Sequence, residues 1–103
     1  MRIAIYGTGG AGGYFGARLA AAGEDVVFLA RGEHLGAIRE RGLRLTTPVD
    51  DVTIHPAAAF DDPSQAGTVD AILFGVKTWQ LADAARAAIQ MLGPDTFAVP
   101  LQN

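Results

Sequence analysis

Apolar and polar positions alternate in blocks along this chain, and the blocks predict strands and helices in turn. Residues 2–6 form a short apolar run that leads into a cluster of glycines, which is typical of a buried parallel strand ending in a tight turn. A helix that ends at Gly23 is predicted next, because apolar residues recur at spacings of four, four and three. These residues are Ala11, Phe15, Leu19 and Ala22.

The middle of the chain repeats this order with weaker signals. Residues 25–30 are a second apolar run, and the segment around Leu35 and Ile38 predicts a short helix that Gly42 stops. On either side of Pro48, apolar and polar residues alternate, which predicts one or two half-exposed strands with a turn between them. The apolar members of this alternation are Leu43, Leu45, Val52 and Ile54. Ala57–59 is interpreted as a helix-forming or packing segment.

The last third contains the longest strand-like run, residues 69–76, which predicts a central strand. Pro63 predicts a short helical turn before it, and residues 96–101 predict a last strand. Between these strands a second helical stripe ends at Gly93, and its members are Leu81, Ala85, Ala88 and Leu92. The alternation predicts the α/β class: a Rossmann-like, doubly wound, mainly parallel sheet with helices on both faces.

Composition narrows the choice of function. The 103 residues are half apolar and 18% charged, so we expect residues 1–103 to form one globular domain. A net charge of -3 disfavours nucleic acid and anionic membranes as partners. No apolar run approaches the ~20 residues that are needed to span a bilayer. Without cysteine or a signal peptide, a cytoplasmic location is expected. No metal site is expected either, because His34 and His55 lack a second ligand at metal spacing and are interpreted as surface or loop residues.

The glycine-rich segment between the first strand and the first helix has the G-x-G-x-x-G spacing of a dinucleotide-binding loop. In that pattern Gly7 permits the tight turn, Gly9 lets the backbone approach a pyrophosphate, and Gly12 lets the helix pack closely on the strand. The alternative is a purely structural turn, which the strand-to-helix context disfavours. The predicted cofactor-binding loop comprises Gly7, Thr8, Gly9, Gly10, Ala11 and Gly12.

The residue that follows the second strand predicts which dinucleotide binds. NAD-binding domains commonly carry an acidic residue there, about 20 residues past the glycines, for the ribose 2′-hydroxyl. This chain has Arg31 instead, whose guanidinium suits a 2′-phosphate, so NADP(H) is the predicted cofactor. The alternatives are that Arg31 is an ordinary surface arginine, or that Glu33 serves in an NAD-preferring protein.

Two further polar residues follow strands at the edge where such folds bind ligands. Lys77, the single lysine, is predicted to contact cofactor or substrate, against the alternative of a solvated lysine at a helix start. Asn103 follows the last strand, and its amide can bond both a nicotinamide ribose and a substrate. Trp79 and Phe15 are interpreted as packing residues. Because the sequence stops directly after a strand at this edge, we expect a longer natural protein.

Four segments together carry a family likeness: GTGGAGGYFG at 7–16, ARG at 30–32, VKTWQ at 76–80 and LQN at 101–103. In this order and spacing they resemble the ketopantoate reductases, along the whole length of the chain. The resemblance implies NADPH-dependent reduction of 2-dehydropantoate to (R)-pantoate in pantothenate biosynthesis.

The resemblance also implies roles for individual residues. Residues 7–12 would bind the pyrophosphate, Arg31 the 2′-phosphate, Lys77 the cofactor near the reacting centre, and Asn103 both cofactor and substrate. The family's proton-donating lysine lies in a C-terminal helical domain without counterpart here, so no catalytic residue is assigned and this chain alone is expected to be inactive. Apolar surface where that domain would dock leaves a homodimer as one open outcome.

Two other functions stay open. Related Rossmann proteins with helical C-terminal domains reduce other 2-keto acids or act as hydroxyacid, opine or glycerol-phosphate dehydrogenases. In a different class, a non-catalytic module would sense NADP(H) for a partner protein.

Overall fold

The computed structural model describes residues 1–8, 11–49, 51–55 and 58–101. A five-stranded sheet in the order β5-β2-β1-β6-β7, with every neighbouring pair parallel, forms its centre. The predicted Rossmann-like α/β fold is therefore confirmed. The strands and helices run in this order: β1 (Arg2–Tyr6), α1 (Ala11–Ala21), β2 (Asp25–Leu29), α2 (Gly32–Arg41), β3 (Leu43–Thr46), β4 (Asp51–Ile54), β5 (Ala58–Phe60), the 3-10 turn η1 (Pro63–Gln65), β6 (Ala71–Phe74), η2 (Thr78–Gln80), α3 (Leu81–Ala88), η3 (Ile89–Met91) and β7 (Phe97–Pro100).

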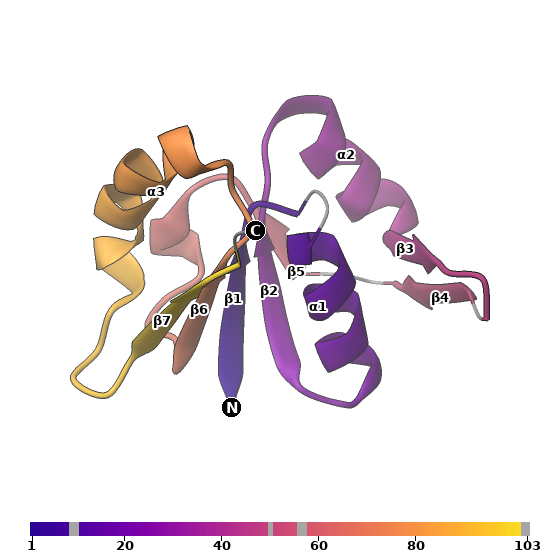
Figure 1. Ribbon diagram of the computed structural model, residues 1–103, viewed down its shortest axis with the longest axis horizontal. Coiled ribbons are helices and arrows are strands. Elements are labelled where there is room, and N and C mark those ends of the chain that lie inside the picture. The colour runs from indigo at the N-terminus through magenta and orange to yellow at the C-terminus, as the bar shows by residue number, and fades with distance from the viewer. Residues whose placement is uncertain (9–10, 50, 56–57, 102–103) are drawn as a thin grey trace.

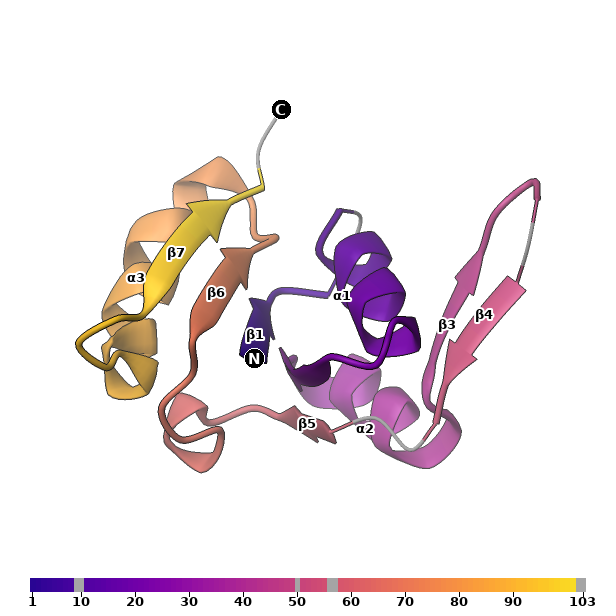
Figure 2. The same ribbon diagram turned by 90° about the horizontal axis from the view of Figure 1, so that it is seen from below.

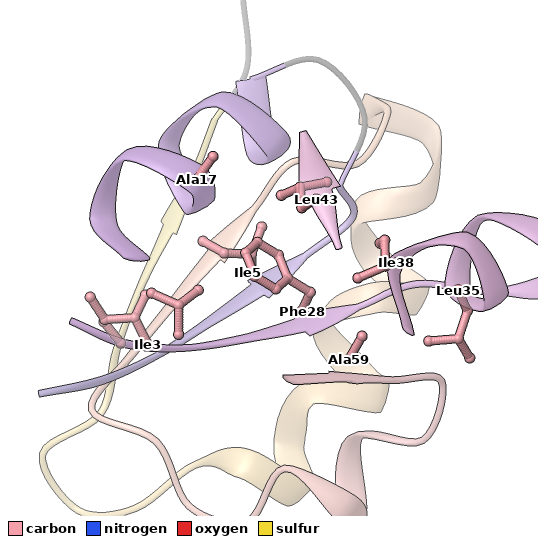
Figure 3. Close-up of a cluster of buried hydrophobic side chains, with 10 residues drawn as sticks. Ile3, Ile5, Ala17, Phe28, Leu35, Ile38, Leu43 and Ala59 are labelled. Carbon is pink, nitrogen blue, oxygen red and sulfur yellow. The ribbon is translucent and has the colours of Figure 1, made fainter. Parts of the chain in front are cut away.

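Helices cover both faces of the sheet, α1 and α2 on one side and α3 on the other (Figures 1 and 2). Successive residues of a strand point to opposite faces, so β1 supplies Ile3 and Ile5 to one buried cluster and Ala4 to the other. Figure 3 shows Ile5 and Phe28 pointing toward Ala17 of α1. Burial on both faces explains why β1 and β2 are nearly uninterrupted apolar runs.

Helix α1 lies very close to the sheet because small residues form its contact face. A Cβ at Gly16 would lie 2.5 Å from Cε1 of Phe28 and 2.9 Å from Cγ1 of Ile5, and Ala17 is fully buried. The predicted stripe was wrong at Phe15, which is 43% exposed. The larger side chain points away because only glycine and alanine fit between the helix and the sheet.

Helix α3 also buries a different stripe from the one predicted. Ala84, Ala88 and Met91 face the core, whereas Ala85 is exposed and Leu92 is 47% exposed. At Met91 and Leu92 the physical reason is that the α-helix ends at Ala88 and continues as the tighter 3-10 turn η3, which rotates the residues that follow.

Several strand and turn predictions are confirmed with changed bounds. The predicted 69–76 strand is shorter as β6, and it lies inside the sheet between β1 and β7. Pro63 begins η1, where the Asp62 carboxylate accepts a 3.0 Å hydrogen bond from the Ser64 backbone N–H. Sequence patterns missed β5, because Ala58 and Ala59 carry little strand preference and pair with β2 at the sheet edge.

The predicted alternating segment forms a separate antiparallel hairpin of β3 and β4 beside α1. Arg44 and Asp51 pair across it, and the hydrogen bond from Arg44 to Asp51, with their Coulomb attraction, raises the pKa of Arg44. Within the ranges described, no helix is both long and apolar enough to cross a bilayer.

Candidate functional site

The loops that follow β1, β2 and β6 meet at one edge of the sheet, where the parallel strands have their carboxyl ends (Figure 1). Backbone hydrogen bonds fix their order: the Gly7 N–H donates to the Leu29 carbonyl at 3.2 Å, and the Gly75 N–H donates to the Tyr6 carbonyl at 2.8 Å. Ligands of doubly wound sheets bind at such an edge, at the point where the chain winds in opposite directions.

Three glycines allow the start of α1 to press against two of these loops. Gly7 has a φ of +92°, which side chains rarely adopt. A Cβ at Gly12 would lie 2.1 Å from the Gly7 carbonyl oxygen, and one at Gly75 would lie 2.7 Å from both that oxygen and Cα of Gly12. Gly12 therefore has the position that its motif predicts. No pattern in the sequence indicated Gly75, because the start of α1, which is distant in the chain, leaves no room for a Cβ there.

The start of α1 has the features of an anion site. The first turn contains no acidic residue, and the first backbone N–H groups of a helix lack partners within it and carry partial positive charge. Gly9, Gly10 and the side chain of Ala11 lie outside the described residues. Thr8 is described, and it is buried, with 7% of its surface exposed.

Arg31 lies at the beginning of α2, where it is the N-cap residue with an extended backbone, φ -135° and ψ 160°. Its side chain is exposed, and within the described part of the chain its guanidinium makes no hydrogen bond or ion pair. Glu33 is also exposed in the first turn of the same helix. A free guanidinium at this edge is available to a bound anion.

A hollow of about 460 Å³ lies beside Arg31, between the end of β1 and the start of α3. Its size falls in the range of small-molecule sites. Its walls combine an aromatic ring, small apolar residues and a few polar groups. The lining residues are Tyr6, Arg31, Val76, Trp79, Gln80, Asp83, Ala84 and Ala87.

Two residues after β6 differ in how far the structure supports their predicted roles. Trp79 is 79% exposed at the hollow, so its interpretation as a packing residue was wrong. The short turn η2 places the ring outside the core, before α3 begins to pack. Lys77 is exposed at the same edge, and its backbone N–H donates a 3.1 Å hydrogen bond to Oε1 of Gln80. The predicted site residue Asn103 lies outside the described residues.

His34 belongs to the site, although its sequence context gave it no role. It lies in the first turn of α2, and its Nε2 forms a short hydrogen bond with Oγ1 of Thr8 in the glycine loop. The contact joins residues 26 positions apart, so no local pattern could have indicated it. His55 remains an exposed residue after β4. No group of three potential metal ligands occurs among the residues whose placement is described.

Comparison with known proteins gives consistent matches along the chain. A 2-dehydropantoate 2-reductase from Mesorhizobium japonicum is 36% identical and matches all of this chain and 32% of its own length. The crystal structure of a PanE/ApbA family ketopantoate reductase from Ralstonia eutropha is 39% identical, with a TM-score of 0.92 over all of this chain and 34% of that one. A D-mandelate dehydrogenase in complex with NADH and anilino(oxo)acetate is 28% identical, with a TM-score of 0.88 over all of this chain and 33% of that one.

These matches define how much of a relative the chain represents. It spans about a third of the length of the curated relatives. The family model described as ketopantoate reductase PanE/ApbA matches residues 3–103. The chain therefore belongs to the ketopantoate reductase PanE/ApbA family.

Proposed function

We propose that this chain is the NADPH-binding part of an oxidoreductase that reduces 2-dehydropantoate to (R)-pantoate. The observation that carries the proposal is the meeting of the glycine loop, the Arg31 guanidinium and the hollow at one edge of the sheet. Among the residues that the structure describes, that guanidinium has no partner. Membership of the family supports the substrate, since two relatives that match the whole chain are named 2-dehydropantoate 2-reductase.

The residues present fit a dinucleotide. The close approach of Gly7, Gly12 and Gly75 leaves backbone where side chains would otherwise stand, as a loop that binds a pyrophosphate through backbone N–H groups requires. The hollow is large enough for the adenine base, with the Trp79 ring and the Arg31 guanidinium at its walls. Planar groups of both kinds stack on bases.

Arg31 supports NADPH over NADH. Its position after β2 is where a ribose 2′-phosphate would lie, and a guanidinium binds phosphate through paired, charge-assisted hydrogen bonds. Lys77 would add a second positive charge near the cofactor, and Asn103 would bond both cofactor and substrate. The cofactor supplies hydride, and the chain's own residues bind and orient it.

The remaining steps of the reaction are assigned outside this chain. Hydride delivery to a ketone requires a general acid for the developing alkoxide, and we assign none to residues 1–103. A lysine in a further, C-terminal helical domain would serve, and that domain would also bring in a homodimer contact. We place the reaction in the cytoplasm, in pantothenate biosynthesis.

A second candidate is a 2-hydroxyacid dehydrogenase with another 2-keto acid as substrate. The observation that favours it is the 28% identity and the TM-score of 0.88 with D-mandelate dehydrogenase. That structure contains NADH, so this candidate differs from the first in both substrate and cofactor preference.

The test is steady-state turnover of the protein that the complete gene encodes. We expect NADPH oxidation to be faster with 2-dehydropantoate than with phenylglyoxylate. Arg31→Ala should raise the KM for NADPH about 10- to 100-fold and leave the KM for NADH unchanged. Arg41→Ala is the matched control, since Arg41 is exposed in the last turn of α2. Faster turnover of phenylglyoxylate with NADH would favour the second candidate, and NADPH binding without any turnover would leave a sensing module.

A further inference from the structure

The contact between Thr8 and His34 connects two parts of the proposed cofactor site. Thr8 lies in the loop between β1 and α1, and His34 lies in the first turn of α2, three residues after Arg31. The short hydrogen bond between Oγ1 of Thr8 and Nε2 of His34 therefore joins the loop proposed for the pyrophosphate and the helix proposed for the 2′-phosphate.

The burial of Thr8 gives this bond its importance. Thr8 is the one polar residue classed as buried within the described ranges, with 7% of its surface exposed. A buried hydroxyl that lost its partner would favour a different loop conformation, in which water reached it. His34 is exposed, so its ring is not held by the core and can be replaced without creating a cavity.

The position of Thr8 makes the loop conformation matter for binding. Its backbone carbonyl lies against α1, since a Cβ at Gly13 would be 2.3 Å from the Thr8 oxygen. Thr8 is thus fixed on one side by α1 and on the other by His34. The N–H groups of the loop can face a pyrophosphate only while this residue holds its place.

We propose that His34 is a positioning residue for the dinucleotide: it fixes the glycine loop through Thr8 and sets the loop at a constant distance from Arg31. The role rests on the proposed binding of NADPH. It differs from that of Arg31 in one measurable respect. Arg31 would contact a group that only NADPH has, whereas a correctly placed glycine loop serves NADPH and NADH equally.

The experiment measures dissociation constants of NADPH and NADH for the protein of the complete gene, with His34→Ala, Thr8→Val and the double variant. Each single variant should weaken binding of both dinucleotides about three- to tenfold, the range for one neutral hydrogen bond. The double variant should bind no more weakly than either single one, because both remove the same bond.

Conservative variants separate positioning from a general loss of stability. His34→Gln and Thr8→Ser keep a group that can bond, and they should bind both dinucleotides within about twofold of the wild type. His55→Ala is the matched control for a histidine outside the site, and it should change neither constant. If His34→Ala fails to fold, the comparison of Thr8→Val with Thr8→Ser tests the same bond.

Each contrary result has a distinct meaning. Wild-type protein that binds no NADPH would overturn the proposed function, and the role of His34 with it. Normal binding by both His34→Ala and Thr8→Val would overturn the positioning role alone. Weakened binding of NADPH with unchanged binding of NADH would also overturn it, since His34 would then contact the 2′-phosphate directly.

Discussion

Replacing Gly12 with alanine tests the close approach on which the site is built. The new Cβ would lie 2.1 Å from the Gly7 carbonyl oxygen and 3.3 Å from Cα of Gly75. All of these obstructing atoms belong to the backbone, so no rotamer change relieves the clash and the start of α1 must move. Overpacking of this kind costs about 1–3 kcal/mol of unfolding free energy. Since the loop moves with the helix, we also expect NADPH affinity to fall at least about tenfold.

The matched control is Gly36→Ala in α2. Gly36 is likewise a helical glycine, but nothing lies within 4 Å of its added Cβ. That variant should gain about 0.5–1 kcal/mol from helix preference, so the two variants should differ by about 1.5–4 kcal/mol. Urea unfolding measures the unfolding free energy of each variant, and fluorescence titration with NADPH measures its affinity for the cofactor. A Gly12→Ala protein that equals the wild type in stability and in NADPH affinity would refute the steric reasoning.

Two further predictions concern the hollow and the core. Trp79→Ala should weaken NADPH binding by about 1–3 kcal/mol, because it removes a stacking surface. Ile89→Ala, at an exposed residue that begins η3, should leave the affinity unchanged. Equal affinities of the two variants for NADPH would show that the base lies elsewhere. Thr96→Val should lower the unfolding free energy by about 1–3 kcal/mol in thermal or urea unfolding. The Thr96 hydroxyl accepts a hydrogen bond from the Gly93 N–H at 2.8 Å and donates one to the Val69 carbonyl at 2.5 Å. The control is Thr53→Val, at an exposed residue, which should leave the unfolding free energy unchanged. Equal losses of unfolding free energy in the two variants would contradict the role of the Thr96 bonds.

The parts of the fold that the sequence predicted well are those in which each segment carries its own signal. β1 and β2 are apolar on both faces, so their composition alone predicts buried parallel strands. The hairpin of β3 and β4 alternates because one face of it is exposed. β5 carries no such signal: it is three residues long and becomes a strand only because β2 offers a free edge.

Helix faces were predicted less well for a related reason. In α1 the contact with the sheet is made by Gly16 and Ala17, which hydrophobic periodicity counts for little, and the large ring of Phe15 drew the predicted stripe to the wrong side. A stripe of small residues marks the closest packing, whereas a stripe of large residues marks a wider separation. Periodicity identifies the helix but does not decide which of two adjacent stripes is buried.

The residues of the candidate site likewise fall into two groups, those that local sequence patterns indicate and those that depend on distant contacts. Gly7, Gly12 and Arg31 were predicted because the motif and its offset to the second strand are local properties of the sequence. Gly75 and His34 have their roles only through contacts with segments distant in the chain, with the start of α1 and with Thr8. Sequence patterns therefore indicated the residues proposed to touch a ligand more readily than those proposed to hold them in place.

The order of strands explains why such holding residues are needed. Because β1 lies between β2 and β6, the glycine loop is flanked by the loop that carries Arg31 and by the loop that carries Gly75. Neither neighbour is close in sequence, so backbone hydrogen bonds between the strand ends, packing and side-chain bonds set the spacing of the three. The buried clusters lie on the two faces of the sheet, and neither Arg31 nor Glu33 belongs to them. Changes confined to Arg31 and Glu33 should therefore alter dinucleotide preference while leaving the unfolding free energy close to that of the wild type.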